Sequence, residues 1–160
     1  MRYEDMEKYR VMAVGRYAVE AGFPLLRPTD VVFSISDPGA PPVAYKGTPH
    51  ALRRFEFIDT SDPIDGMDAE DAFDVMETLR DMPAGGRVIC QCFAGASRSL
   101  SLAMAIVDVF GWGRGQVWVG VGYAHGLPPN RHVYALGAIA AKEALEGRRI
   151  RRATPTVPTI

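Results

Sequence analysis

The sequence predicts one α/β domain, in which a central, largely parallel sheet of about four or five strands is flanked by helices. Short β-branched or aromatic runs, such as residues 31–35 and the run before Cys92, alternate with longer helical patterns. The chain has 160 residues, 48% hydrophobic and 23% charged, which are values of a globular protein with a single core. A formal net charge of −1 gives no overall attraction to nucleic acid or to an anionic membrane.

The first third of the chain is predicted to form three strands. Residues 10–14 should be a short strand, followed by a helical piece over residues 16–20. Residues 31–35 have the composition of a central strand. Residues 39–49, rich in glycine and proline, are expected to be a surface loop without chemistry of its own. Residues 52–58 alternate like another strand.

An acidic loop and two helices follow. Residues 59–66 are rich in acids and turn formers. From Asp68 onward, apolar residues recur at steps of three and four, as on one face of an amphipathic helix: Ala69, Ala72, Phe73, Met76 and Leu79. Residues 99–110 carry a single charge, Asp108, which predicts a helix that lies deep against the sheet.

The last part of the chain is predicted to be a helix and a tail. Asn130 is a good N-cap for a final helix that ends at Gly147. Residues 1–147 then make up the domain. Residues 148–160, basic and rich in threonine and proline, are expected to be an extended tail.

Cysteine and histidine usage limits the possible sites. Cys90 and Cys92, the two cysteines of the chain, cannot build a disulfide framework, which favours a reducing cytoplasm. The three histidines show no zinc-binding spacing with them, so no metal or other cofactor is expected. No run reaches the roughly 18 apolar residues of a membrane span, and the first residues lack the apolar stretch of a signal peptide, so we expect a soluble protein without a targeting segment.

The loop after Cys92 has the features of an anion site. Cys92 is followed by Gly95, and Arg98 and Ser99 come at a C-x5-R-S spacing between a predicted strand and a predicted helix. Such a loop can turn successive backbone N–H groups inward around an anion, and the helix start adds its positive dipole end. The guanidinium of Arg98 can bind phosphate through two parallel hydrogen bonds.

Each loop residue has an expected role. A helix N-terminus and a neighbouring arginine favour thiolate, which makes Cys92 the candidate nucleophile. Ser99 either donates its hydroxyl to the sulfur or caps the helix. Cys90, two positions earlier, should pack beneath the loop as a small apolar residue. The expected phosphate-binding residues between Cys92 and Arg98 are Phe93, Ala94, Gly95, Ala96 and Ser97.

The segment from Gln91 to Ser99 resembles the signature loop of the dual-specificity and protein-tyrosine phosphatase superfamily. In that family a histidine usually precedes the cysteine, and this chain has Gln91 there. The resemblance implies the family's fold and a helix over residues 115–123, where Val117, Val119 and Val121 alternate like a strand. Pro129–Asn130 is similar to the pair that precedes the family's last helix.

The resemblance also implies a general acid roughly thirty residues before the cysteine, at the end of the preceding strand. Asp59, Asp62 and Asp65 precede Cys92 by 33, 30 and 27 residues. Asp59 fits the context best and Asp62 is the second choice. Alternatively, these aspartates form turns or interact favourably with the dipole of the following helix.

The expected function is hydrolysis of phosphate monoesters through a phosphocysteine. The resemblance implies phosphotyrosine or phosphoserine/threonine in proteins as substrates, while small phosphate esters remain open. Loop residues 93–97 include no lysine, which favours a single phosphate. Two alternatives are a phosphate-binding module without turnover and a sulfur-transfer or arsenate-reducing thiol enzyme. Against the second, Cys90 lies in the adjacent strand and is poorly placed to resolve a disulfide.

Overall fold

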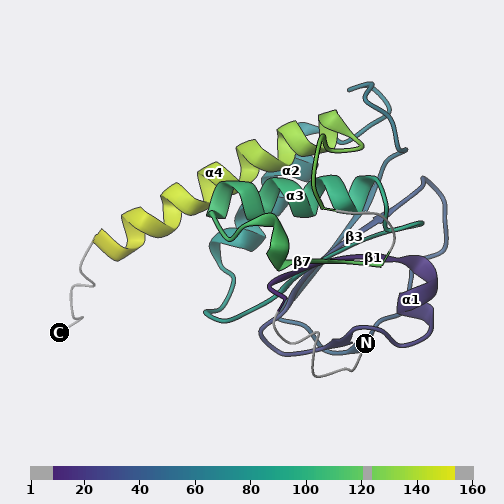
Figure 1. The fold of residues 1–160 in the computed structure, drawn as a ribbon, viewed down its shortest axis with the longest axis horizontal. Helices are drawn as coiled ribbons and strands as arrows, with labels where there is room; N and C mark the ends of the chain where they lie inside the picture. The colour runs from purple at the N-terminus through teal and green to yellow at the C-terminus, as the bar shows by residue number, and fades with distance from the viewer. Residues whose placement is uncertain (1–8, 121–123, 154–160) are drawn as a thin grey trace.

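The centre of the molecule is a five-stranded sheet in the order β5-β3-β6-β1-β7 (Figure 1). The computed structural model describes residues 9–120 and 124–153, with 150–153 by backbone alone. Every neighbouring pair in the sheet is parallel. A second, two-stranded sheet pairs β2 (Leu25–Leu26) with β4 (Lys46–Gly47). The strands of the main sheet are β1 (Val11–Gly15), β3 (Val31–Ser36), β5 (Ala51–Glu56), β6 (Val88–Cys92) and β7 (Val117–Val119).

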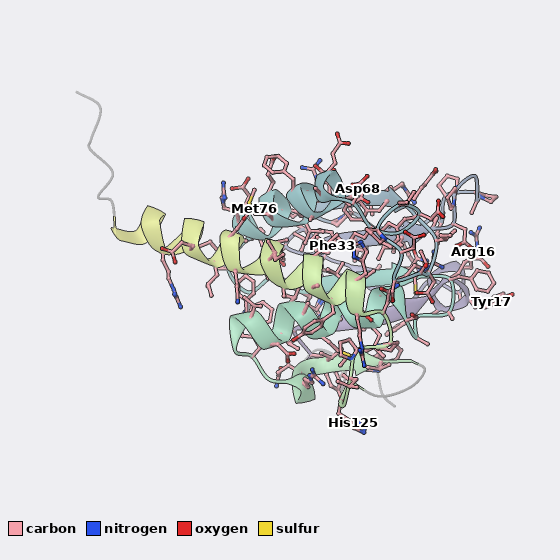
Figure 2. All side chains as sticks on the ribbon, turned by 90° about the horizontal axis from the view of Figure 1, so that it is seen from above. Arg16, Tyr17, Phe33, Asp68, Met76 and His125 are labelled. Atoms are coloured by element: carbon pink, nitrogen blue, oxygen red, sulfur yellow. The ribbon has the colours of Figure 1, made fainter. Side chains whose placement is uncertain are left out.

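The helices lie on both sides of the main sheet. Three long helices cover one face, and α1 (Arg16–Glu20) lies with the two-stranded sheet on the other (Figure 1). Seen from above, α4 runs between α2 and α3 (Figure 2). The three are α2 (Ala69–Arg80), α3 (Arg98–Phe110) and α4 (Arg131–Ala153). The predicted class, a single α/β domain with a parallel sheet of four or five strands, is therefore confirmed. None of the helices in the described ranges is both long and apolar enough to cross a bilayer.

Burial alternates along the inner strands with period two. Val88, Cys90 and Cys92 of β6 belong to the cluster beneath the three long helices, whereas Ile89 belongs to the cluster on the opposite face. Because successive strand residues point to opposite faces, Gln91 shares the face of Ile89. The two faces are both covered, which explains why these strands are apolar at nearly every position.

Most predicted elements agree with the structure within two residues. Strands expected at 10–14, 31–35 and 52–58 correspond to β1, β3 and β5. The helix expected from Asp68 is α2, and Asp68 is its N-cap: its side chain accepts from Asp71 N, and the Asp71 side chain accepts from Asp68 N.

The helix expected over residues 115–123 is wrong. A short 3₁₀ turn, Arg114–Gln116, leads into β7, which pairs in parallel with β1 at the sheet edge. Val117 is buried in β7, so the alternation of the valines in the sequence indicates a half-buried strand. Val121 lies outside the described residues.

The last helix does not end at Gly147. It continues to Ala153, so residues 148–153 are helical and do not belong to an extended tail. A Cβ at Gly147 would lie 2.6 Å from Arg80 Nε, so this glycine allows α4 to approach α2 closely. Arg148 Nη1 then donates to Leu79 O at 2.9 Å, which holds the next turn on α2. Residues 154–160 lie outside the described part.

The 39–49 segment is more than a surface loop. It contains β4 and the buried side chain of Val43. Arg54 Nη2 donates to Val43 O at 2.9 Å, and Arg16 Nη1 donates to Pro41 O at 3.0 Å. These contacts hold the segment against the face of the sheet opposite the long helices.

A buried ion pair joins the starts of β3 and β6. Arg87 Nε and Nη2 donate to the two carboxylate oxygens of Asp30 at 3.0 and 2.7 Å. The Asp30 side chain is 0% exposed and that of Arg87 is 6% exposed. Asp30 also accepts from Arg27 N at 2.8 Å. Removing one partner of such a pair leaves a buried charge without compensation.

We therefore expect Asp30→Ala to lower the free energy of unfolding by about 3–5 kcal/mol, measured by urea denaturation. The matched control is Glu20→Ala, which removes the exposed Arg16–Glu20 pair one helical turn apart. Its expected cost is below about 0.5 kcal/mol. If the two variants lost the same free energy of unfolding, the buried Asp30–Arg87 pair would not stabilise the protein more than an exposed pair does.

Candidate active site

The loop of residues 93–97 connects the carboxyl end of β6 to α3, and it lies directly against the end of β1. Gly95 has φ +73°, and a Cβ there would lie 2.6 Å from Gly15 N. A Cβ at Gly15 would lie 2.9 Å from Ala94 O. Arg16 N donates to Phe93 O at 2.9 Å across the same contact. Only glycine fits at either position without a shift of the backbone.

The sulfur of Cys92 lies at the base of this loop. It is 3.1 Å from Ser99 Oγ, which corresponds to the first of the two roles expected for Ser99. Ser97, the N-cap residue of α3, makes no side-chain cap. Cys90 is 0% exposed beneath the loop, and burial raises the pKa of its thiol far above the usual range.

The loop presents backbone donors and the positive end of a helix. Within the described part of the chain, the backbone N–H groups of residues 94–97 donate to no protein acceptor. The first turn of α3 contains no acid, whereas Glu70 and Asp71 occupy the first turn of α2. The dipole of α3 is thus not offset by its own side chains, and its N-terminus favours an anion.

Arg98 is fixed at the end of the loop. Its Nη1 donates to Asp37 Oδ1 and to Phe57 O, both at 2.8 Å. The residue is 5% exposed, and Asp37 and Phe57 follow directly after β3 and β5. One guanidinium nitrogen therefore anchors the side chain to two strand ends, and Nε and Nη2 have no partner among the described residues.

Asp59 joins the loop to the start of α4. Its Oδ1 accepts from Ser97 Oγ and from Asn130 Nδ2, both at 2.8 Å. Asn130 also caps α4, because its Oδ1 accepts from Val133 N at 3.0 Å. Asp62, the second choice for the acid, accepts from Ile64 N at 2.9 Å within its own turn. Among the aspartates proposed from the sequence, the structure brings Asp59 to the loop and leaves Asp62 in a turn.

Comparison of the chain with protein-family models, curated proteins and solved structures finds no significant match. The interpretation of the site accordingly depends on its residues and their geometry. In the described ranges, no three histidine, cysteine, aspartate or glutamate side chains are grouped so that they could hold a metal ion.

An apolar groove borders the loop. Its volume is about 480 Å³. The rings of Tyr17 and Phe93, 73% and 52% exposed, meet edge to face with centroids 6.0 Å apart. Figure 2 shows Arg16 and Tyr17 at the end of the molecule opposite the free end of α4. The groove is lined by Gly15, Tyr17, Ala18, Phe93, Ala94, Trp118 and Gly120.

Sequence reasoning missed several residues of this site. Asp37 was not among the predicted site residues, although an acid directly after a buried central strand lies at the sheet edge where ligands bind. Asn130 was expected as a helix cap, and its second contact with Asp59 spans 71 positions. The contact between Gly15 and Gly95 likewise has no local signal in the sequence.

Iodoacetate at pH 7 is expected to modify Cys92 and to spare Cys90. The raised pKa of the Cys90 thiol keeps its thiolate scarce at neutral pH, and its modification should increase only as the pH rises. Arg98 and the start of α3 also attract the anionic reagent to Cys92. Peptide mass spectrometry of the folded protein measures both sites. The Cys90→Ser control should react at the wild-type rate, and equal labelling of both cysteines would contradict the prediction.

Proposed function

We propose that the chain is a cysteine-dependent phosphatase that hydrolyses phosphate monoesters through a phosphocysteine. The proposal is supported by the sequence from Gln91 to Ser99, which resembles the signature loop of the dual-specificity and protein-tyrosine phosphatase superfamily. The observation that carries the proposal is the Cys92 sulfur at the base of a loop whose N–H groups at residues 94–97 donate to no described protein acceptor. Arg98 completes this set of donors.

In the first step the Cys92 thiolate attacks phosphorus, so that an S–P bond forms while the ester P–O bond breaks. The Ser99 hydroxyl, 3.1 Å from the sulfur, stabilises the thiolate by a hydrogen bond. Arg98 and the loop N–H groups stabilise the charge on the equatorial oxygens. Asp59 gives a proton to the leaving oxygen.

In the second step water attacks the phosphorus of the phosphocysteine and transfers a proton to Asp59. The S–P bond breaks, the thiolate returns and inorganic phosphate leaves. Asp59 suits both proton transfers, because Ser97 and Asn130 hold its Oδ1. Its Oδ2 has no partner among the described residues, so it is available to carry the proton.

The proposed substrates are singly phosphorylated. Residues 93–97 include no lysine, and Arg98 is the cation that the loop itself supplies. Phosphotyrosine and phosphoserine/threonine in proteins share this chemistry with small phosphate esters. The exposed rings of Tyr17 and Phe93 beside the loop make an aryl phosphate a suitable first probe.

The arrangement of the Cys90 and Cys92 thiols argues against sulfur transfer and against arsenate reduction by a dithiol route. Such a route needs a second accessible thiol that attacks the first sulfur. Cys90, the second cysteine of the chain, is fully buried, and the raised pKa of its thiol disfavours the attacking thiolate. A phosphate-binding module without turnover remains the main rival, and the next experiment separates the two.

Hydrolysis of 4-nitrophenyl phosphate tests the proposal. Wild type should release phosphate, and Cys92→Ser should fall to background because its hydroxyl is almost wholly protonated at neutral pH. Cys90→Ser is the matched control and should keep most of the activity. Equal rates for wild type and Cys92→Ser would refute the mechanism. A wild type that binds orthovanadate without releasing phosphate from the ester would establish the binding module instead.

Asp59→Asn tests the general acid while retaining an oxygen that can accept from Ser97 and Asn130. With phenyl phosphate, a poor leaving group, turnover should fall by about 10²- to 10⁴-fold. The loss should be small with 4-nitrophenyl phosphate, whose leaving oxygen needs no proton. Asp62→Asn is the control, and a wild-type rate of Asp59→Asn on phenyl phosphate rules out this role.

A further inference from the structure

Gln91 lies directly beneath the proposed nucleophile, on the opposite face of the sheet. It is 1% exposed. Ser34 of β3 is paired with it in the sheet register, and Tyr45 reaches it from the 39–49 segment. The register between β3 and β6 ends at this pair, so Cys92 is the first residue of β6 beyond the ladder with β3.

The side-chain amide of Gln91 has partners on both ends. Its Oε1 accepts from Ser34 Oγ at 2.6 Å and from Tyr45 OH at 3.0 Å. Its Nε2 donates to the backbone oxygen of Cys92 at 2.9 Å. A carbonyl can only accept, whereas the two hydroxyls can donate, so these partners define which end of the amide faces Cys92.

We propose that Gln91 is a positioning residue for the nucleophile: its amide holds the Cys92 carbonyl, and Ser34 and Tyr45 hold the amide. The inference rests on the proposed function of the loop. Cys92 is 2% exposed and is paired with Gly15 of β1, but the backbone donor that follows Gly15, Arg16 N, bonds to Phe93 O. The Cys92 carbonyl therefore needs a donor from another source. It is also a backbone oxygen of the residue that carries the sulfur. An amide donor on that oxygen offsets its partial negative charge and fixes the peptide from which the loop starts.

The network provides the same hydrogen bonds over a wide pH range. The Gln91 amide does not titrate, and burial raises the pKa of the Tyr45 phenol, so its hydroxyl remains a donor. No histidine is among the described titratable and charged groups around the network and Cys92. These groups are Arg16, Asp37, Tyr45, Arg54, Asp59, Cys90 and Arg98.

Tyr45 is itself held in place. It lies between Val43, which is buried and accepts from Arg54, and β4, which pairs with β2. Its ring also packs against the cluster that contains Ile89. The 39–49 segment thus supports the loop through the hydroxyl of Tyr45.

The test is the pH dependence of Cys92 alkylation by iodoacetamide, a neutral reagent, in the folded full-length chain. Gln91→Met keeps the shape of the side chain and removes the amide. We expect its alkylation rate at pH 6 to fall about 3- to 10-fold and its pH midpoint to rise. Tyr45→Phe should shift the midpoint in the same direction by less. Gln91→His should add a second step near neutral pH, where imidazole titrates.

Tyr134→Phe is the matched control, because it removes a tyrosine hydroxyl that bonds Asp108, on the surface between α3 and α4. The pH dependence of Cys92 alkylation in this variant should equal that of wild type. Tyr45→Phe keeps the inference testable if Gln91→Met does not fold. Wild-type profiles in folded Gln91→Met or Tyr45→Phe would overturn the inference. Alkylation of Cys92 needs no turnover. If the wild type lacked phosphatase activity, the proposed function would be refuted, and the alkylation profiles would still test the role of Gln91.

Discussion

The close backbone contact between Gly15 and Gly95 is the constraint on which the candidate site depends. A Cβ at Gly95 would lie 2.6 Å from the backbone of β1, and Gly95 has φ +73°, where a side chain is strained. The contact presses the loop onto the end of β1. The loop can therefore stay compact over five residues, with its N–H groups unused by the sheet and α3 starting at Arg98.

The site is a property of the sheet edge as a whole. In a parallel sheet all strands finish at one edge, and ligands bind beyond those ends. Arg98 is bonded to residues that follow β3 and β5, and Asp59 comes three residues after β5. Asn130 brings the start of α4 to the same point. Four segments far apart in the sequence thus place the Arg98 cation, the acids Asp37 and Asp59 and the Cys92 thiol around the same loop.

Local patterns predicted most of the fold, because a buried strand, a small-residue loop and an apolar helix each have a composition of their own. The error at β7 has a physical cause: three residues at a sheet edge carry too little pattern to outweigh an expected helix. The prediction that the last helix ends at Gly147 was wrong for another reason. The glycine lies inside α4 because the helix packs closely on Arg80, and the local sequence does not show this contact. Apart from the bond of Gln91 to the neighbouring Cys92, the side-chain partners of Arg98, Asp59 and Gln91 are 38 to 71 positions away along the chain, and no local pattern encodes them.

The alternation of a strand explains why the residue before the cysteine has no part in the chemistry proposed for the loop. Cys92 points to the face of α3, and Gln91 points to the face of Ser34 and Tyr45. Gln91 therefore acts on the sulfur only through the backbone of Cys92. A histidine at this position adds a group that titrates near neutral pH, whereas glutamine supplies the same donor to a carbonyl without titrating. On this reasoning, glutamine in place of histidine changes the pH behaviour of the loop, and leaves the thiol, arginine and acid in place.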